Sequence, residues 1–521
     1  MSAPPESQKK TATVEIKKTL GLMGLTINAM AFIAPGAFLW LTIQAQAAQV
    51  DPAGFSTAPD IWFGLLVALI LSFLTAASYA WLARRYPEAG AGSSYYYAQR
   101  AFLDRGSSNR SARNVKFAVG WLSHLYYWVY PGVMVAFMAI LVSFILQSFG
   151  FAITATTQIG IAVAFSLVVG FIAYRGIQGS TRTNLVVNVI QLTMLFAVTI
   201  MALAYRFINP EQVTFTFTNI GAIVLPHDAS HVLFQAAVAI LVLVGFESIS
   251  ALASEAKNPK DIPRAVLLSL IIQGVIAYLF GYFGVQAWMN SKYSFSAAAA
   301  SGAPLGDMAR IMGDAFFGGN GFVFMLIAAA AVAAAVLGTT LACLNVGVRV
   351  TYAISRDTEA PQPLGKLDTR YGTPAIGVWV LTAVSATIGA FGVLNLRNLT
   401  AIVLLSNFGT FLLYGITCIV TIIALSKERR SILSRYVIPI LGFGANMVML
   451  GAVVWLGFIG GSDTQWAALF AIAVTAIWML LGLGYFARNS RSTPSPVFPF
   501  PGKERPEDRN TKYWIHGDQK N

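Results

Sequence analysis

Cysteine is almost absent from this chain of 521 residues, which contains only Cys343 and Cys418. Both lie within long apolar runs, and their spacing matches neither a metal site nor an obvious disulfide, so we interpret them as small core residues. The sequence also lacks a cluster of histidine and carboxylate residues and a nucleophile motif. It therefore predicts neither an enzyme nor a metal site, and no cofactor is expected.

Charge is scarce as well, because only 11% of the residues are charged whereas 56% are hydrophobic. The hydrophobic residues fall into runs of about 20, the length of an α-helix that crosses a bilayer. A soluble all-helical protein would instead show amphipathic stripes with polar faces. The composition therefore predicts an all-α integral membrane protein.

We count twelve apolar runs and predict a transmembrane helix in each: 20–46, 59–82, 117–147, 157–174, 184–205, 231–253, 264–287, 317–347, 374–393, 398–425, 436–460 and 464–487. The tail 1–19 is polar and basic and has no cleavable signal pattern, so the first span is expected to stay in the mature protein. The tail 488–521 is rich in proline and charge and is expected to be disordered.

The 35 Lys and Arg residues are distributed unevenly between the segments that join these spans. If both tails are cytoplasmic, 31 of them lie on the cytoplasmic side, and the other 4 are Arg206, Lys292, Arg310 and Arg397. Positive residues are typically retained on that side. The pattern predicts a multi-pass protein of the cell (plasma or inner) membrane with both termini in the cytoplasm. Topology and contact with anionic lipid then account for the net charge of +13 without nucleic-acid binding.

Two of the spans contain residues that interrupt a helix. The first carries Ala34-Pro35-Gly36, where proline removes a backbone donor and clashes with the preceding turn, although a simple kink is the alternative. The sixth carries Gly245. Breaks five helices apart are typical of a five-plus-five inverted repeat, in which helices 1 and 6 unwind face to face near the midplane. We expect the repeats at 20–205 and 231–425, with the helices of 436–487 outside them.

One carboxylate, Glu247, lies deep within an apolar run, directly after the second break. A charge at this depth is costly and is usually retained for function, so the combination indicates a transporter binding site. No Lys or Arg lies at the same depth, and burial favours the neutral carboxyl group, so we expect Glu247 to be protonated for part of a transport cycle. Its candidate roles are a proton site, a gate partner and a fixed hydrogen-bond acceptor.

The two breaks offer backbone groups that suit a zwitterion. Free N–H groups where helix 1 restarts favour a carboxylate, and free carbonyl groups where helices 1 and 6 stop favour an ammonium group. Tyr127 belongs to an aromatic cluster in the third span that either lines a pathway or forms an interfacial belt. The predicted substrate-binding residues are Ile33, Ala34, Pro35, Gly36, Ala37, Tyr127, Val244, Gly245 and Phe246.

Adjacent hydroxyl groups at Thr339 and Thr340 form a second polar feature near the depth of the first break. Such a pair can coordinate sodium together with backbone carbonyl groups, since hard cations prefer oxygen ligands. The alternative is ordinary hydrogen bonding of each hydroxyl within its own helix. Together with Glu247, these two residues are the predicted coupling or gating residues.

The stretches Gly245–Ala265, Tyr86–Gly90 and Arg349–Asp357 resemble the amino acid permeases of the amino acid–polyamine–organocation superfamily, and the resemblance covers most of residues 17–425. It implies a leucine-transporter-type fold, alternating access around a midplane site, and an aromatic lid at Phe246, for which plain apolar packing is the alternative. The sequence departs from the family at 34–38, where the usual Gly-x-Gly-Ile-Phe is absent, and at Trp81, where a glutamate is common. Span 184–205 also lacks the lysine of some proton-coupled members.

The expected function is secondary active transport of amino acids, as proton-coupled uptake or exchange, with an amino acid and membrane lipids as partners. One alternative is an organic monoamine or polyamine carrier, although a single buried carboxylate suits several ammonium groups poorly. The other is a sodium-coupled amino-acid symporter. The sequence contains nothing that resembles the filter of an ion channel. Which amino acid is carried and the oligomeric state stay open.

The charge asymmetry gives a direct test of topology. Single cysteines introduced at Asp51 and Lys292 should react with an impermeant thiol reagent on intact cells, because both positions fall in predicted external segments. A cysteine at Lys366 should react only after the cells are permeabilised. Labelling at position 366 but not at 292 on intact cells would contradict the predicted orientation.

Overall fold

The computed structural model describes residues 20–33, 37–176, 181–209, 220–251, 256–289, 293–357, 359–368, 370–428 and 431–489. The predictions for the tail 1–19, for Ala34, Pro35 and Gly36, and for residues 490–521 therefore concern positions outside the described residues.

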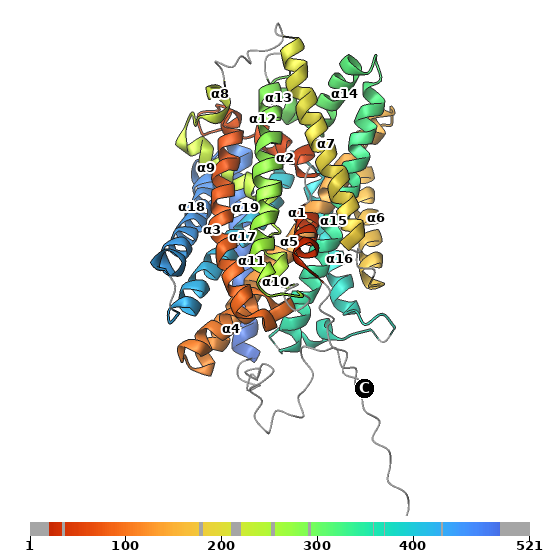
Figure 1. Cartoon of the computed structure of the whole chain (residues 1–521). Helices are drawn as coiled ribbons and strands as arrows, with labels where there is room; N and C mark the ends of the chain where they lie inside the picture. Colours follow the sequence, from red (N-terminus) through yellow and green to blue (C-terminus); the bar gives the residue numbers. More distant parts are fainter. Residues whose placement is uncertain are drawn as a thin grey trace, which may run out of the picture.

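The described part of the chain is helical throughout, with only two isolated β-bridges and no longer strand (Figure 1). Ten of its helices are long and apolar enough to cross a membrane. They are Ala58–Arg85, Asn109–Ser148, Ala155–Tyr174, Asn184–Ile208, Asp261–Trp288, Gly321–Arg356, Ala375–Gly392, Leu396–Leu425, Leu433–Ile459 and Ser462–Arg488. Shorter apolar helices cover Leu22–Ile33 and Ala229–Val242. The all-α, multi-pass membrane architecture agrees with the sequence-based expectation.

The long elements are α3 (Ile61–Arg85), α5 (Asn109–Ser148), α6 (Ala155–Tyr174), α7 (Thr181–Ile208), α15 (Gly321–Arg356), α16 (Ala375–Gly392), α17 (Leu396–Leu425), α18 (Ile438–Ile459) and α19 (Ser462–Asn489). The remaining span, Asp261–Trp288, consists of α11 (Asp261–Leu270), the π-helical η7 (Ile271–Tyr278) and α12 (Leu279–Trp288), which follow one another without a gap. The shorter elements are α1 (Leu22–Ile33), α2 (Ala37–Ala47), η1 (Ala58–Asp60), η2 (Pro87–Gly92), α4 (Ser94–Arg105), α8 (Gly221–Val224), α9 (Ala229–Ala239), η5 (Ile240–Val242), α10 (Ser248–Ala251), α13 (Phe295–Ala300), α14 (Pro304–Phe316), η8 (Gln362–Gly365) and η9 (Leu433–Val437).

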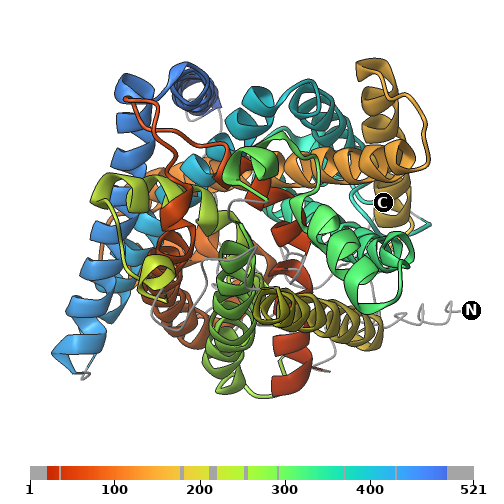
Figure 2. The ribbon, with the colours of Figure 1, turned by 90° about the horizontal axis from the view of Figure 1, so that it is seen from above.

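Helices α5 and α17 form the core of the bundle. In the most apolar 18-residue stretch of each of these two helices, 72% of the stretch is buried, compared with 22% in the same kind of stretch in α6. Helix α5 packs against α15, α16 and α17, and the view along the bundle shows it running through the middle of the other helices (Figure 2). α18 and α19 pack on α17 at one edge of the bundle. Both α5 and α17 can therefore present side chains to the centre of the protein.

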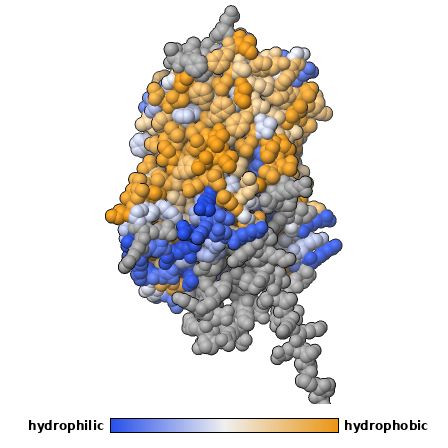
Figure 3. All heavy atoms as spheres, in the orientation of Figure 1, coloured by the Kyte–Doolittle hydropathy of each residue, from blue (hydrophilic) through white to orange (hydrophobic). Residues whose placement is uncertain are grey.

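Large apolar side chains cover the outside of the bundle, which is the surface that faces lipid. Exposed examples lie on α6, α7, α18 and α19, among them Phe171, Ile190, Trp455 and Leu480. On the face seen in Figure 3 they form a broad apolar band, and hydrophilic residues gather below it, near the end of the bundle that carries α4. We call this the α4 end, and the opposite end, which carries α13 and α14, the α14 end (Figure 1).

A fully buried ion pair joins three elements at the α4 end. Lys116 of α5 lies 2.8 Å from Asp357, which directly follows α15, and the hydroxyl of Tyr95 in α4 donates to the same carboxylate at 2.9 Å. Nearby, Arg113 pairs with the buried Glu359 at 2.7 Å. Removing one partner of such a pair would leave an uncompensated buried charge, which costs about 3–5 kcal/mol. The pairs therefore fix α4 and α5 to the end of α15.

A second polar cluster fixes the start of α9 at the α14 end. Asp60 is fully buried in η1 and accepts the backbone N–H of His227 at 2.7 Å, while Asp51 lies 3.2 Å from the ring of His231. Burial opposes ionisation of Asp51, but the backbone N–H of Phe55 and the side chain of His231 outweigh it and hold its pKa below the usual range. The segment between α2 and α3 is thereby tied to the first turn of α9.

Candidate functional site

The first apolar span is described in two pieces, α1 up to Ile33 and α2 from Ala37. Ala34, Pro35 and Gly36, where the sequence predicts a break, lie outside the described residues, so this break stays a prediction. A break there would leave the last carbonyl groups of α1 without partners in their own helix.

Three side chains from two other elements, η7 and α15, donate hydrogen bonds to these carbonyl groups. They are Gln273 Nε2 to Met30 O at 2.7 Å, Thr339 Oγ1 to Ala31 O at 3.2 Å, and Tyr278 Oη to Ile33 O at 3.2 Å. The carbonyl group of Ile33 is therefore not unpaired, in contrast to the simplest expectation. It keeps a second lone pair for another donor, because a carbonyl oxygen accepts two hydrogen bonds.

The sixth span is interrupted within the described residues. α9 continues into the 3₁₀ turn η5, which ends at Val242, and helical structure resumes at α10 with Ser248. Between them Gly245 has a φ of 127°, which L side chains rarely adopt. A Cβ atom at Gly245 would lie 2.5 Å from the ring of Phe32 and 3.0 Å from the side chain of Ile33. Gly245 therefore lies against Phe32 and Ile33, the last residues of α1 that the structure describes.

Glu247 lies in the turn that follows Gly245 and is completely buried. Its carboxylate accepts the backbone N–H of Gly245 at 3.0 Å, the hydroxyl of Tyr126 in α5 at 2.9 Å and the hydroxyl of Tyr414 in α17 at 2.7 Å. Among the described residues, no ion pair joins Glu247 to a basic side chain. Three neutral donors thus hold the carboxylate, and they connect the broken span to both core helices.

Aromatic rings surround this turn. Phe246 is fully buried and packs edge to face on Tyr79, with 6.1 Å between the ring centroids. Its ring is tilted against that of Tyr414, with 5.4 Å between the centroids. Tyr127 is also buried, and its ring lies 4.5 Å from that of Tyr126. Both predicted aromatic residues thus belong to the layer beside Glu247. These contacts are those of ordinary packing, and a lid role for Phe246 stays a prediction.

The two adjacent threonine hydroxyls of α15 have different partners. Thr339 donates to the carbonyl oxygen of Ala31 near the end of α1, whereas Thr340 donates to Val336 O at 2.6 Å within its own helix. A sodium site would need both oxygen atoms to face one point. Thr340 instead has the within-helix bond that was the alternative for this residue.

Several polar groups that stabilise the breaks were not singled out as site residues from the sequence. Asn407 Nδ2 of α17 donates to Ala237 O in α9 at 2.7 Å, and Asn188 Nδ2 of α7 donates to Ile27 O in α1 at 3.0 Å. An amide side chain within an apolar run is a visible signal, because it needs a partner in the membrane. The sequence does not reveal which backbone group that partner is.

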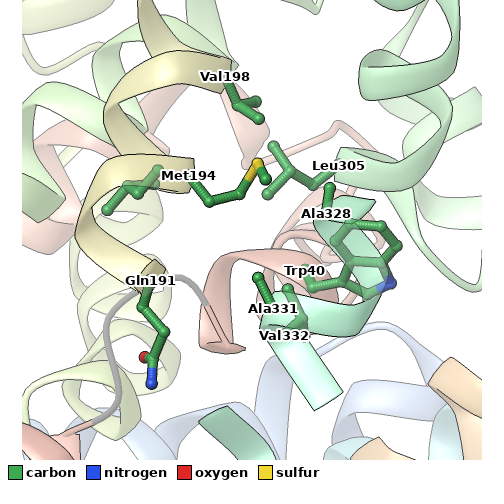
Figure 4. A pocket seen from close by; sticks show the side chains of 9 residues that line it. Trp40, Gln191, Met194, Val198, Leu305, Ala328, Ala331 and Val332 are labelled. Carbon is green, nitrogen blue, oxygen red and sulfur yellow. The ribbon is translucent and has the colours of Figure 1, made fainter. Parts of the chain in front are cut away.

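A small crevice lies beside the start of α2 (Figure 4). Trp40 of α2, Met194 of α7, Leu305 of α14 and Ala328 of α15 face it, and Gln191 supplies a polar group at one side. Its volume of about 20 Å³ is close to that of one water molecule on the same scale. The crevice is therefore too small for a substrate as it stands.

Comparisons with known proteins agree over nearly the whole chain. A family model described as amino acid permease matches residues 18–480. The chain is 24% identical over 497 residues to the branched-chain amino acid permease BcaP of Bacillus subtilis (strain 168), which covers 91% of this chain and 94% of that protein. It is 25% identical over 496 residues to the low-affinity putrescine importer PlaP of Escherichia coli (strain K12), covering 94% of this chain and 97% of that protein. The similarity thus extends across the helical bundle.

The geometry at Gly245 predicts a large difference between two glycine substitutions. Gly245→Ala should destabilise the protein by about 1–3 kcal/mol, because alanine must adopt a strained backbone and its Cβ overlaps Phe32. Gly338→Ala in α15 is the matched control. Nothing lies within 4 Å of its added Cβ, and alanine favours the helix by about 1 kcal/mol. Melting temperatures of the detergent-purified variants should fall for the first and be unchanged or raised for the second. Equal melting temperatures would show that the turn at Gly245 is not tightly constrained.

Proposed function

This chain belongs to the amino acid permease family, and we propose that it carries amino acids across the cell membrane by alternating access. The observation that carries the proposal is the contact between Gly245 and the end of α1 at Phe32 and Ile33. Two helix breaks that meet inside a bundle place free backbone groups around one point, where a substrate can bind. Membership of the family makes the chain a secondary transporter and not an enzyme.

We propose that α1 and α2 together form helix 1, and that α9 and α10 form helix 6, of a twelve-helix protein. The spans up to residue 205 then form the first repeat and 231–425 the second, related by inversion. Helices α18 and α19 lie outside the repeat, which is consistent with their packing on α17 at the edge of the bundle. In this arrangement both termini and the α4 end face the cytoplasm.

The backbone chemistry at the breaks favours a zwitterion as the substrate. If helix 1 restarts at the predicted break, the first turn of α2 would offer N–H groups to a carboxylate. The remaining lone pair of Ile33 O and the carbonyl group of Val244 would receive an ammonium group. Phe246 and Tyr127 would then bound the space beside the substrate, from the aromatic layer that surrounds Glu247.

Two substrate classes are candidates for this chain, amino acids and polyamines, because one relative is named a branched-chain amino acid permease and another a putrescine importer. A diamine needs acidic partners for two ammonium groups. Glu247 is the buried carboxylate nearest the breaks, and three donors already hold it. The described surroundings of the breaks therefore suit an amino acid better than a polyamine.

Glu247 is the proposed coupling residue. A carboxylate accepts hydrogen bonds at both oxygens, whereas a protonated carboxyl group carries a donor on one of them. Proton binding would therefore reverse the hydrogen bond of Tyr126 or Tyr414, whose hydroxyl groups also accept, or displace the N–H of Gly245. Either change would alter the turn between the halves of the sixth span. Protonation of Glu247 would in this way be coupled to a conformational change of the sixth span. Sodium coupling through Thr339 and Thr340 is less favoured, because Thr340 is bonded within its own helix.

Competition for uptake tests the substrate class. In proteoliposomes, unlabelled branched-chain amino acids should reduce uptake of labelled L-isoleucine, whereas putrescine should compete poorly, for lack of a second buried carboxylate at the breaks. An amine with the same side chain but no carboxylate should also compete poorly, because it cannot use the N–H groups of α2. Efficient competition by putrescine would favour the polyamine alternative.

Glu247→Gln separates the roles proposed for this residue, because glutamine keeps the size and, like the protonated carboxyl group, carries a donor on one side, but it cannot titrate. We expect the variant to exchange substrate across the membrane but to lose uphill uptake, so that accumulation driven by a proton gradient falls to a ratio of about one. Accumulation and exchange should be measured across roughly pH 5 to 8, where a buried carboxyl group can titrate. Tyr414→Phe is the matched control, since it removes one donor to Glu247 and leaves the carboxyl group.

The control variant should keep a pH-dependent accumulation even if its rate falls. If Glu247→Gln accumulates substrate with the rate and pH dependence of the wild type, Glu247 is a fixed acceptor of the turn and another group couples transport to the gradient.

A further inference from the structure

Two histidines and two carboxylates lie together at the α14 end, away from the breaks. His231 Nε2 lies 3.2 Å from Asp51 Oδ2, and its other ring nitrogen, Nδ1, lies 3.7 Å from Asp60 Oδ2. His227 Nδ1 lies 3.2 Å from Asp60 Oδ1. We refer to Asp51, His231 and Asp60 as the Asp–His–Asp cluster. His231 precedes Gly245 by fourteen residues, or about four turns of helix, so the cluster takes no part in the proposed transport site.

The two histidines differ in their exposure to water. The side chain of His231 is 15% exposed and that of Asp60 is fully buried, whereas the side chain of His227 is 43% exposed. Water and salt screen the ion pairs of exposed side chains, which therefore contribute little to stability. The charge of His231 is thus the one that matters for the attachment of Asp51 to Asp60.

Both ring nitrogens of His231 face a carboxylate oxygen. A neutral imidazole has one N–H group and one lone pair, so one of the two contacts would place a lone pair against a negative oxygen. The imidazolium form carries an N–H group at both positions and is attracted to both carboxylates. The geometry therefore suits a His231 that has bound a second proton.

Other charged groups around the start of α9 have partners of their own or lie far from it. The carboxylate of Asp228 caps α9 and accepts the backbone N–H of His231 at 3.2 Å. Arg397 of α17 pairs with Asp463 of α19 at 3.8 Å. Among the described elements that pack on α9, α2, α18 and η5 carry no charged side chain. Helix α3 carries its charged residues in its last turn, at the opposite end: Arg84 and Arg85.

The segment between α2 and α3 is attached to α9 at two levels. At its base, Gln235 Nε2 donates to Thr57 Oγ1 at 2.8 Å, and no ionisable group takes part in this contact. At its tip, Oδ1 of Asp51 accepts the backbone N–H of Phe55 at 2.8 Å, and Oδ2 faces His231. A change of charge at His231 therefore acts on the tip and leaves the base attached.

We propose that the Asp–His–Asp cluster is a proton-operated latch, in which the imidazolium form of His231 joins Asp51 to Asp60 and fixes the tip of the segment 49–57 to α9. Loss of one proton from His231 leaves a single N–H group between two carboxylates and releases the tip. Histidine side chains ordinarily change charge between about pH 5 and 8. The latch is therefore closed at the acidic end of this range and open at the alkaline end. Only its assignment to the external side depends on the proposed orientation of the bundle.

Asp51 keeps its charge across this range of pH. Burial opposes ionisation of its carboxyl group, but the backbone N–H of Phe55 and the side chain of His231 hold its pKa below the usual range. Titration of Asp51 therefore lies at more acidic pH and does not reverse the effect. The attachment of the tip is present while His231 is charged and is lost as the pH rises.

Hydrogen exchange of the detergent-purified wild type tests the latch without substrate or a proton gradient. The amide of Asp51 reports on the tip, because it donates to Phe55 O at 2.8 Å. After correction for the intrinsic effect of pH on exchange, its protection should fall about ten-fold between pH 5 and pH 8, the effect of losing one hydrogen bond to a charged group. The turn between α14 and α15 is the matched control. There Gly321 N–H donates to Asp314 Oδ1 at 2.8 Å, and residues 314–321 contain no histidine, so protection should be constant.

Two substitutions remove the proton site in different ways. His231→Gln keeps a donor for a carboxylate but cannot titrate, whereas Asp51→Asn keeps an oxygen for the backbone of the tip but removes the negative charge. Each should make protection of the segment 49–57 independent of pH, and the second does not depend on the folding of the first. His227→Gln is the matched control, because this ring is the more exposed one, and it should keep the pH dependence of the wild type.

The same protection at pH 5 and pH 8 in the wild type would overturn the latch, and so would an equal fall in the turn between α14 and α15. A pH dependence that persists in a folded His231→Gln or Asp51→Asn protein, or that disappears in His227→Gln, would assign the proton to another group and also overturn it. The absence of amino acid transport would instead contradict the proposed function and leave these results unchanged.

Discussion

A helix that stops inside a membrane leaves backbone groups without partners, and the structure around the two breaks depends on satisfying them. Water cannot do so in the apolar interior, and each unsatisfied group costs several kcal/mol. Gln273 of η7 and Thr339 of α15 donate to carbonyl groups in the last described turn of α1, and Asn407 of α17 donates to a carbonyl group of α9. On the acceptor side, the carboxylate of Glu247 receives the N–H group of Gly245. Polar side chains from several helices thus gather at these backbone groups.

Glu247 connects the broken span to the core of the bundle, which supports the proposed coupling role. Its carboxylate joins the turn at Gly245 to α5 and α17, which are the most buried helices. A change in its protonation would alter the contact of the broken span with both of them. The two ends of the bundle contain different polar features. At the α4 end the buried Lys116–Asp357 ion pair holds α5 to the end of α15, whereas the α14 end contains an uncharged polar cavity.

Much of this architecture could be predicted from the sequence. Apolar runs locate the helices, and Gly245 marks a break because no other residue readily adopts its backbone conformation. Helix ends were less accurate: α5 begins at Asn109 and not near 117, since its first turns are polar and continue beyond the apolar run. The hydrogen-bond and packing partners of the polar residues could not be predicted from the sequence. Tyr126 and Tyr414 meet Glu247 only because α5 and α17 cross there, and the burial of Asp60 and Lys116 depends on packing between segments far apart in the sequence.

The central claim is that an amino acid binds between the two breaks, and an experimental structure with a bound substrate tests it most directly. A map of the protein in nanodiscs with saturating L-isoleucine should show α1 ending at Ile33 and α9–η5 ending before Gly245. The ligand carboxylate should lie at the N-terminus of α2, and its ammonium group should lie within about 3 Å of the carbonyl oxygens of Ile33 and Val244. Continuous helices through both positions, or a ligand bound elsewhere with this point filled by side chains, would contradict the account.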